Sequence, residues 1–414
     1  MKKTNLTKLL QASALLVSGA LLSACGSDDS TDSSAAGSTD ICVSTGTDVN
    51  WEALLTENCE KLSDYNLFSD STDPSSNPNS TGIPYDLSTP LFTDYASKYR
   101  FVFVPEGETA TYSEYEVMEF PVGTVLVKTF SLPDDTSNRD GGETKIETRL
   151  LINRADGWTS LPFYWETTED AKYVVAGKTV SDVSITHNGE VKTFDYLVPQ
   201  KNQCTKCHTV SPMLQNSEDT RTGIFKPIGP KARYLNHNYT YSDATGPENQ
   251  LLKWVEAGIL TGLPTDETTI DTAADFHDDT VIADLDSDAL NLAARSYLDI
   301  NCAHCHRSEL TIPEPFYEGP AGDSGLQVEF NRDFAADPGK FGVCKSAVAS
   351  GHEDFPRDII PGFADSSYLP FRMNSLDGTH KMPELGRSIV HTEGVDLIKA
   401  WIDNMDADDC NLNL

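Results

Sequence analysis

The stretch VSITHNGEVKTFDYLV, residues 183–198, shows most plainly what kind of structure this chain forms. Apolar and polar residues alternate from Val191 to Tyr196, which is the period of a strand with one buried face. Asn188-Gly189 stands between two such runs, where a two-residue type I′ turn requires residues that tolerate positive φ. The stretch therefore predicts an antiparallel hairpin.

Similar runs of β-branched and aromatic residues precede the hairpin. They cover residues 100–104, 123–130, 146–153 and 161–165, and turn-forming residues separate them. They predict an all-β domain over residues 61–199, a sandwich or a jelly-roll-like fold. This segment has His187 and Met118 but no cysteine, so a copper site of His, Cys and Met cannot be built within it. We expect this β-rich segment to serve as a packing or docking domain.

Two CxxCH motifs follow this β-rich segment. Their cysteines and histidines are Cys204, Cys207 and His208 in the first, and Cys302, Cys305 and His306 in the second. On a helical turn this spacing puts both sulfurs on one side, where they can add to the two vinyl groups of a haem, and the histidine then meets the iron. A zinc site needs four ligands from two distant motifs, and a redox CxxC pair needs no histidine. The motifs predict two covalently bound haem c groups.

The chain supplies a candidate sixth ligand for the second haem, with packing in the haem pocket as the alternative role of this residue. Met382 lies in the segment KMPELG, residues 381–386, and an amphipathic helix is expected from Thr392 onward. A further helix over residues 288–299 leads into the second motif. This order resembles the class I cytochrome c fold, and the resemblance implies ligation of the iron by His306 and Met382. Arg372 is a candidate partner for a haem propionate, with an exposed charge as the alternative.

The first haem departs from that pattern, because the strand ending at Val198 leaves no room for a helix before Cys204. His237 and Met213 are the candidate sixth ligands. An iron without a strong sixth ligand is the other possibility, and it would open the first haem to catalysis.

The N-terminus predicts export. Three lysines precede an apolar run over residues 9–22, which ends in Leu22-Ser-Ala-Cys25. The run resembles the lipobox of bacterial lipoproteins, which implies removal of residues 1–24 and a lipid anchor on Cys25. Gly26, where an aspartate would favour the inner membrane, points to the outer membrane.

The nine cysteines divide accordingly. One carries lipid and four carry haem, which leaves Cys42, Cys59, Cys344 and Cys410 in an oxidising compartment. Four cysteines allow three pairings. Proximity in the sequence favours Cys42–Cys59 and Cys344–Cys410, with free thiols as the alternative.

Composition limits the function and the domain number. The chain has 414 residues with Lys+Arg 31 against Asp+Glu 64, a net charge of −33, which excludes nucleic acid as a partner.

We predict an α+β multidomain fold in which a β-sandwich-like domain precedes two mainly α-helical, cytochrome c-like haem domains. The expected segments are a signal peptide (1–24), a tether with a disulfide-linked segment (25–60), the β-rich domain (61–199), the first haem domain (200–282) and the second haem domain (283–414).

Over its whole length the chain resembles di-haem c-type cytochrome lipoproteins of Gram-negative bacteria. The resemblance implies single-electron transfer between periplasmic redox proteins, by a body held in the periplasm or at the cell surface through its lipid anchor. The alternative is a haem enzyme, either peroxidase-like or the haem subunit of an oxidoreductase, with the first haem open to substrate. Electron transfer is favoured over stand-alone catalysis.

Overall fold

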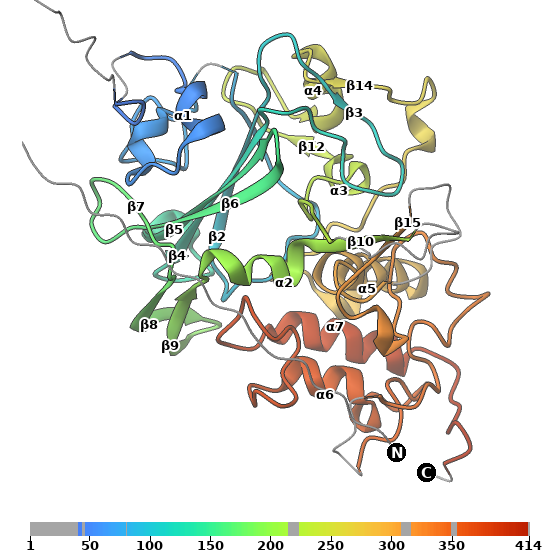
Figure 1. The fold of residues 1–414 in the computed structure, drawn as a ribbon. Coiled ribbons are helices and arrows are strands. Elements are labelled where there is room, and N and C mark those ends of the chain that lie inside the picture. Colours follow the sequence, from blue (N-terminus) through green and yellow to red (C-terminus); the bar gives the residue numbers. More distant parts are fainter. Residues whose placement is uncertain are drawn as a thin grey trace, which may run out of the picture. The chain divides into compact units, whose positions relative to one another are not determined.

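An antiparallel sheet of six strands in the order β1-β2-β4-β5-β6-β7 organises the chain (Figure 1). The computed structural model describes residues 40–43, 46–79, 81–213, 223–307, 316–348 and 354–412. The strands of the sheet are β1 (Ile83–Tyr85), β2 (Ser97–Phe103), β4 (Val125–Pro133), β5 (Glu143–Arg154), β6 (Gly157–Tyr164) and β7 (Lys172–Tyr173). The hairpin beside it consists of β8 (Lys178–His187) and β9 (Glu190–Val198).

Shorter strands and seven α-helices complete the described part of the chain. The short strands are β3 (Ala110–Thr111), β10 (Thr209–Met213), β11 (Ile224–Phe225), β12 (Asn238–Tyr239), β13 (Glu248–Asn249), β14 (Leu260–Thr261) and β15 (Phe316–Glu318). The helices are α1 (Trp51–Thr56), α2 (Thr205–His208), α3 (Ala232–Leu235), α4 (Gln250–Glu256), α5 (Ser287–Asn301), α6 (Tyr368–Asn374) and α7 (Thr392–Asp403). The four earlier runs and the hairpin of the sequence analysis are thus confirmed as β2, β4, β5, β6 and β8–β9.

The two faces of the sheet are both buried, which explains why its strands are apolar on both sides. Phe101, Val127 and Leu150 are neighbours across β2, β4 and β5 and pack against Leu54 and Leu67 of the N-terminal segment. The disulfide between Cys42 and Cys59 closes that segment.

The opposite face of the sheet packs against the middle of the chain. Val102 and Leu126 share one core with Tyr234, Trp254 and Ile300. Residues from the expected β-rich domain and from both expected haem domains therefore lie in the same core, and from Ile41 on the chain forms one compact unit.

The helices α5 and α7 pack against each other in a second core that includes Leu298 and Ile398 (Figure 1). Gly394 permits the close approach, because a Cβ atom there would lie 2.3 Å from the Tyr297 hydroxyl. The helix predicted to lead into the second motif and the helix predicted from Thr392 are both confirmed, as α5 and α7.

The hairpin turn also follows its prediction. Asn188 has φ 51° and Gly189 has φ 77°, and His187 pairs with Glu190 across the turn. Positive φ at both central positions is what a type I′ turn requires.

The two disulfides join the cysteine pairs that sequence proximity favours. Cys42–Cys59 has an S–S distance of 2.06 Å, and Cys344–Cys410 has one of 2.02 Å. The second ties the segment that follows α7 to the loop that precedes α6.

The predicted fold class is wrong. One large antiparallel sheet dominates, and its faces are covered by loops, helices and the separate two-stranded hairpin β8–β9, not by a second large sheet as in a sandwich. In its described part, the segment expected to be a helical first haem domain has only the short α-helices α2, α3 and α4, interleaved with the five-residue strand β10 and several two-residue strands. Strand periodicity fixes which segments are extended, but the partner that buries each face is a tertiary property that periodicity does not contain.

The predicted signal peptide and the lipid-bearing Cys25 lie outside the described residues. Within the described part of the chain, none of the helices has the length and apolar character needed to cross a membrane.

Candidate functional site

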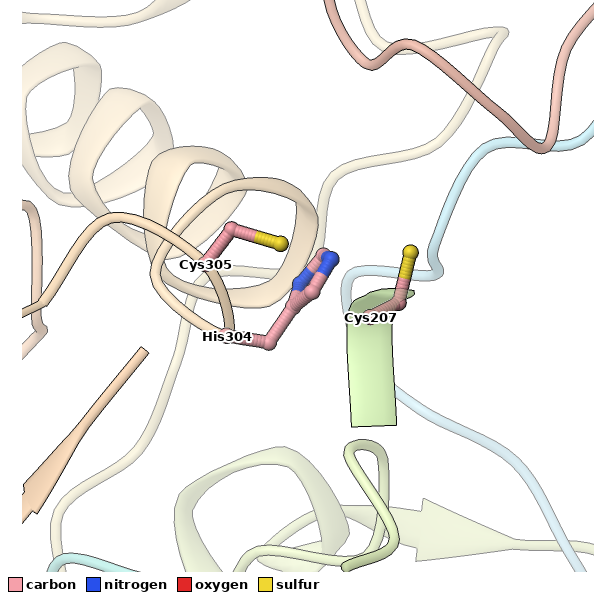
Figure 2. A group of neighbouring side chains, drawn as sticks. All are labelled: Cys207, His304 and Cys305. Atoms are coloured by element: carbon pink, nitrogen blue, oxygen red, sulfur yellow. The ribbon is translucent and has the colours of Figure 1, made fainter. Parts of the chain in front are cut away.

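The two CxxCH motifs lie against each other, although they are far apart in the sequence. The ligand atoms of Cys207, His304 and Cys305 all lie within 4.8 Å of one another. Figure 2 shows the His304 imidazole between the two cysteine side chains, with Cys207 on α2 and the other two residues in the turn that follows α5. The Cys305 sulfur also lies 3.7 Å from the Lys206 carbonyl oxygen. The fold therefore builds one site from both motifs.

The first motif is a single helical turn. The Cys207 and His208 amides both donate to the Cys204 carbonyl, at 3.3 and 3.0 Å. The Cys204 sulfur is buried and lies 3.4 Å from the Ser160 hydroxyl of β6, so the turn rests on the large sheet.

The His208 imidazole is oriented by a backbone contact. Its Nδ1 donates to the Lys226 carbonyl at 2.7 Å, and its ring stacks on Phe225 with centroids 4.9 Å apart. Burial lowers the pKa of His208 to about 4, so the ring is neutral near pH 7. A neutral ring with its proton on Nδ1 leaves Nε2 as a free ligand atom, the state that metal-binding histidines adopt.

The second motif continues from α5. The Cys305 and His306 amides donate to the Cys302 carbonyl, at 3.0 and 2.8 Å. His306 Nδ1 is hydrogen-bonded to the Ser324 hydroxyl at 3.0 Å, and burial lowers the pKa of His306 to about 4. Burial also raises the pKa of the Cys302 thiol to about 12. This motif, too, holds a neutral, oriented imidazole.

A cavity of about 310 Å³, which we call the helix-side cavity, adjoins the second motif. Its lining residues include Cys302, Cys305, His306, Tyr297, Leu298, Tyr368, Leu369, Arg372, Met373, Met382, Arg387 and His391. The structure thus places Met382 and Arg372, both selected from the sequence, in the same cavity as His306. Its volume and largely apolar wall are those of a small-molecule or cofactor site.

The Met382 loop is held by a buried arginine that the sequence analysis missed. Arg387 donates to the carbonyls of Met382, Arg372 and Ser375, at 2.9, 3.4 and 2.8 Å for Nη2. Arg372 donates from Nε to the His380 carbonyl at 2.9 Å. Bonds to main-chain carbonyls fix the loop in a way that the sequence does not signal.

A second cavity, of about 160 Å³, adjoins the first motif, and we call it the sheet-side cavity. Its lining residues include Cys204, Cys207, His208, Arg100, Leu126, Lys128, Arg149, Leu151, Ser160, Pro227 and Ile228. The two cavities are adjacent, because both are lined by Phe92, Cys207, Asn301, His304, Pro383 and Leu385.

The structure does not bring His237 to this cavity. His237 Nε2 lies 3.1 Å from Asp86 and 2.8 Å from the Gln250 side chain, and Nδ1 contacts the Asn238 carbonyl at 3.2 Å. Both ring nitrogens are thus engaged elsewhere, which removes the basis for His237 as a sixth ligand. The Met213 side chain lies outside the described residues, and the described lining of the sheet-side cavity includes no methionine.

His304 and the cations of the sheet were also missed. His304 lines both cavities, and its Nδ1 is buried without a hydrogen-bond partner. Arg100, Lys128 and Arg149 line the sheet-side cavity. Single charges inside otherwise apolar strands were the available signal, since such residues are rarely buried without a partner.

The residues fit covalent haem at both motifs. Each motif presents two thiols on one helical turn, followed by a neutral imidazole anchored through Nδ1, beside its own cavity. This donor set is the one that c-type haem uses. Comparison of the chain with protein-family models, curated proteins and solved structures finds no match.

Proposed function

We propose that this protein is a di-haem c-type cytochrome that transfers single electrons between redox partners. The observation that carries the proposal is the contact between the two CxxCH turns, with Cys207 and Cys305 within 4.8 Å of each other. Each turn adjoins its own cavity, so one cofactor can occupy each side of that contact.

The chain's own residues have distinct roles in this proposal. Cys204 and Cys207 would hold one haem c, and Cys302 and Cys305 the other, and bound haem c supplies one-electron chemistry at its iron. The Lys226 carbonyl and the Ser324 hydroxyl orient His208 and His306, which would each hold an iron. Met382, whose main chain Arg387 fixes, would supply a thioether ligand on the helix side. Electron tunnelling falls steeply with distance, so attachment residues in contact suit a relay.

The proposed location and partners rest on charge and cysteine chemistry. Two disulfides support an oxidising compartment outside the cytoplasm. A net charge of −33 favours a basic redox partner and an association that weakens with salt. We propose export, lipidation at Cys25, and a position at the cell envelope, facing the periplasm or the cell surface.

A pyridine haemochrome assay on the full chain, produced with a haem-attachment system, tests the proposal. We expect two haems per chain. The Cys204→Ala/Cys207→Ala variant and the Cys302→Ala/Cys305→Ala variant should each retain one. A wild-type chain without covalent haem would overturn the proposal.

The cluster of Cys207, His304 and Cys305 supports a second candidate, a metal site. The two motifs are distant in the sequence, which disfavours a shared zinc site, but the fold brings them into contact. Three donors with one open position are the ligand set of a catalytic zinc site. Metal analysis separates the two candidates: His304→Ala abolishes bound zinc in this reading and leaves both haems attached in the first.

The absence of a methionine from the described lining of the sheet-side cavity favours a third candidate, an enzyme with an open first haem. Spectra of the reduced protein with and without CO decide this. Rapid CO binding to one of two haems supports an enzyme, and two inert six-coordinate haems support a relay.

A further inference from the structure

A row of three cations crosses the sheet on the face that lines the sheet-side cavity. Arg100 of β2 pairs in register with Lys128 of β4, which pairs with Arg149 of β5. All three line the cavity. Like charges directly opposite each other destabilise a sheet, and partial burial adds to that cost. A bound anion would therefore stabilise this row of cations.

The described protein residues supply that anion only at one end of the row. Arg149 makes a two-point contact with the buried Glu147 carboxylate, at 2.5 and 2.8 Å. Among the described residues no carboxylate lies within ion-pair distance of Lys128 or Arg100, and Asp86 pairs with His237 instead.

The unpaired state of Arg100 and Lys128 is visible in their contacts. Arg100 is 6% exposed, its Nη2 is buried without a partner, and its Nη1 makes one long bond to the Lys98 carbonyl at 3.4 Å. Lys128 Nζ lies over the Phe130 ring, 5.0 Å from its centroid. Burial and the charges of Arg149 and Arg100 hold the pKa of Lys128 well below its ordinary value.

The strand order and spacing place Lys128 and Arg100 relative to the first motif. The Cys204 sulfur rests on Ser160 of β6, and the strand order from there is β6, β5, β4, β2 (Figure 1). At one strand spacing per step, β4 is roughly 10 Å and β2 roughly 14 Å from β6. The row of cations is in register with Pro162 of β6, so it also lies two residues, about 7 Å, from Ser160 along the strands. A haem joined through its vinyl groups carries its two propionates on the opposite edge of the ring, so a haem bonded at Cys204 and lying along the sheet directs them toward β4 and β2.

We propose that Lys128 and Arg100 bind the propionate carboxylates of a haem attached at Cys204 and Cys207. This inference rests on the proposed function. The guanidinium of Arg100 offers a fork that matches a carboxylate, and Lys128 offers a single ammonium. In this arrangement the propionates would neutralise two partly or fully buried cations for which the described residues supply no carboxylate, and the two contacts would hold the ring against the sheet.

The test uses the full chain with both haems, and the variants Lys128→Met, Arg100→Met and Lys128→Arg. Lys172→Met is the matched control, because Lys172 lies on β7 of the same sheet and is 56% exposed in its side chain. Resonance Raman spectra report the propionate bending modes, and a redox titration reports the two midpoint potentials. The second haem contributes a constant signal.

We expect a shifted propionate mode in Lys128→Met and in Arg100→Met, together with a lowered potential of one haem, because removal of a nearby positive charge favours the ferric state. Lys128→Arg and Lys172→Met should keep the wild-type mode. Unchanged modes in both Met variants, with two haems attached, would overturn the inference and leave the proposed function intact.

A small anion from solution, and not a haem propionate, is the other species that Lys128 and Arg100 could bind. Addition of acetate to the wild-type protein separates the sources: no change is expected, because the propionates already occupy the row. A saturable spectral change with acetate would assign the row to a free anion and overturn the inference. A chain without haem would overturn both this inference and the proposed function.

Discussion

In the sheet-side cavity the wall beside the motif consists of strands and includes Arg100, Lys128 and Arg149, whereas in the helix-side cavity it consists of α5, α6 and the Met382 loop. A CxxCH motif adjoins each of the two cavities. The helix-side cation Arg387 is bonded to main-chain carbonyls, whereas the sheet-side cations Arg100 and Lys128 have no carboxylate partner among the described residues. In the proposed cytochrome, the motif would attach each haem, and the surrounding wall would determine which ligand and which charges that haem meets.

The largest effect is expected from removing the Met382 thioether, because the described lining of the sheet-side cavity includes no methionine. Met382→Ala should abolish the thioether–iron charge-transfer band and lower the potential of one haem, because methionine ligation raises it. Near-infrared spectra and a redox titration measure this. Met373→Leu is the matched control, since Met373 lines the same cavity. A band that persists in Met382→Ala, or disappears only in Met373→Leu, contradicts the assignment.

The second test breaks the connection between the two regions. Asp299 of α5 is 1% exposed and pairs with Lys231 and Arg233, which belong to the segment that follows the first motif. Burial opposes its charge, but Arg233 and Lys231 still hold the pKa of Asp299 well below its usual value. Asp299→Asn leaves two buried cations without a counter-charge, which costs about 3–5 kcal/mol.

Urea unfolding of the haem-free chain measures this cost. Asp288→Asn on the exposed face of α5 is the control, with an expected change below about 1 kcal/mol. Because the folded pKa of Asp299 is depressed, its contribution is present above the unfolded pKa and is lost as the pH falls below it. Equal losses in the two variants would show that the buried contact does not connect the regions.

The sequence predicts the parts of this fold that depend on neighbouring residues, and it does not predict the parts that depend on contacts between distant segments. The strands and the Asn188-Gly189 turn were predicted because alternation and positive φ are properties of neighbouring residues. The single sheet was not, because the N-terminal segment that contains Leu54 and Leu67 covers one face, and this contact joins residues far apart in the sequence. A sandwich and a covered sheet have the same strand pattern.

The site divides in the same way. The CxxCH spacing and the Met382 loop can be recognised from short stretches of sequence. The structure places Met382 in the same cavity as His306. His304 carries no signal of its own, because only the meeting of the two motifs gives it a position between cysteines. Lys128 and Arg100 are neighbours through strand register, which the sequence of either strand alone does not contain.

A third test compares the crosslinks of the two regions. Cys344–Cys410 has a sequence separation of 66 and lies in the helix-side region, and Cys42–Cys59 has a separation of 17 and lies beside the sheet. Removal of either pair by Cys→Ser substitution should cost about 2–4 kcal/mol, with the longer loop costing more. Thermal unfolding of both double variants ranks them. The reverse ranking would mean that the N-terminal contacts with the sheet depend on their crosslink more than loop length implies.

The smallest expected effect concerns Asp278, which reaches the helix-side cavity through His391. The His391 ring contacts Asp278 at 3.1 Å, and Arg139 contacts the other carboxylate oxygen at 3.0 Å. Burial raises the pKa of Asp278, but the hydrogen bond with His391 and the nearby positive charges outweigh it and lower the pKa from 3.8 to about 2. The carboxylate is partly exposed, so its contribution near pH 7 is about 1–2 kcal/mol.

The sign of the pH dependence follows from that depressed pKa. A carboxyl group that binds its proton less tightly when folded stabilises the chain above the unfolded pKa, and this stabilisation is lost as the pH falls from about 4 toward about 2. Asp278→Asn removes it at every pH. The stability difference between wild type and variant, from urea unfolding between about pH 3 and pH 7, should therefore shrink toward the acid end. A constant difference would mean that the contact acts through packing, and the helix-side network would then hold its shape independently of charge.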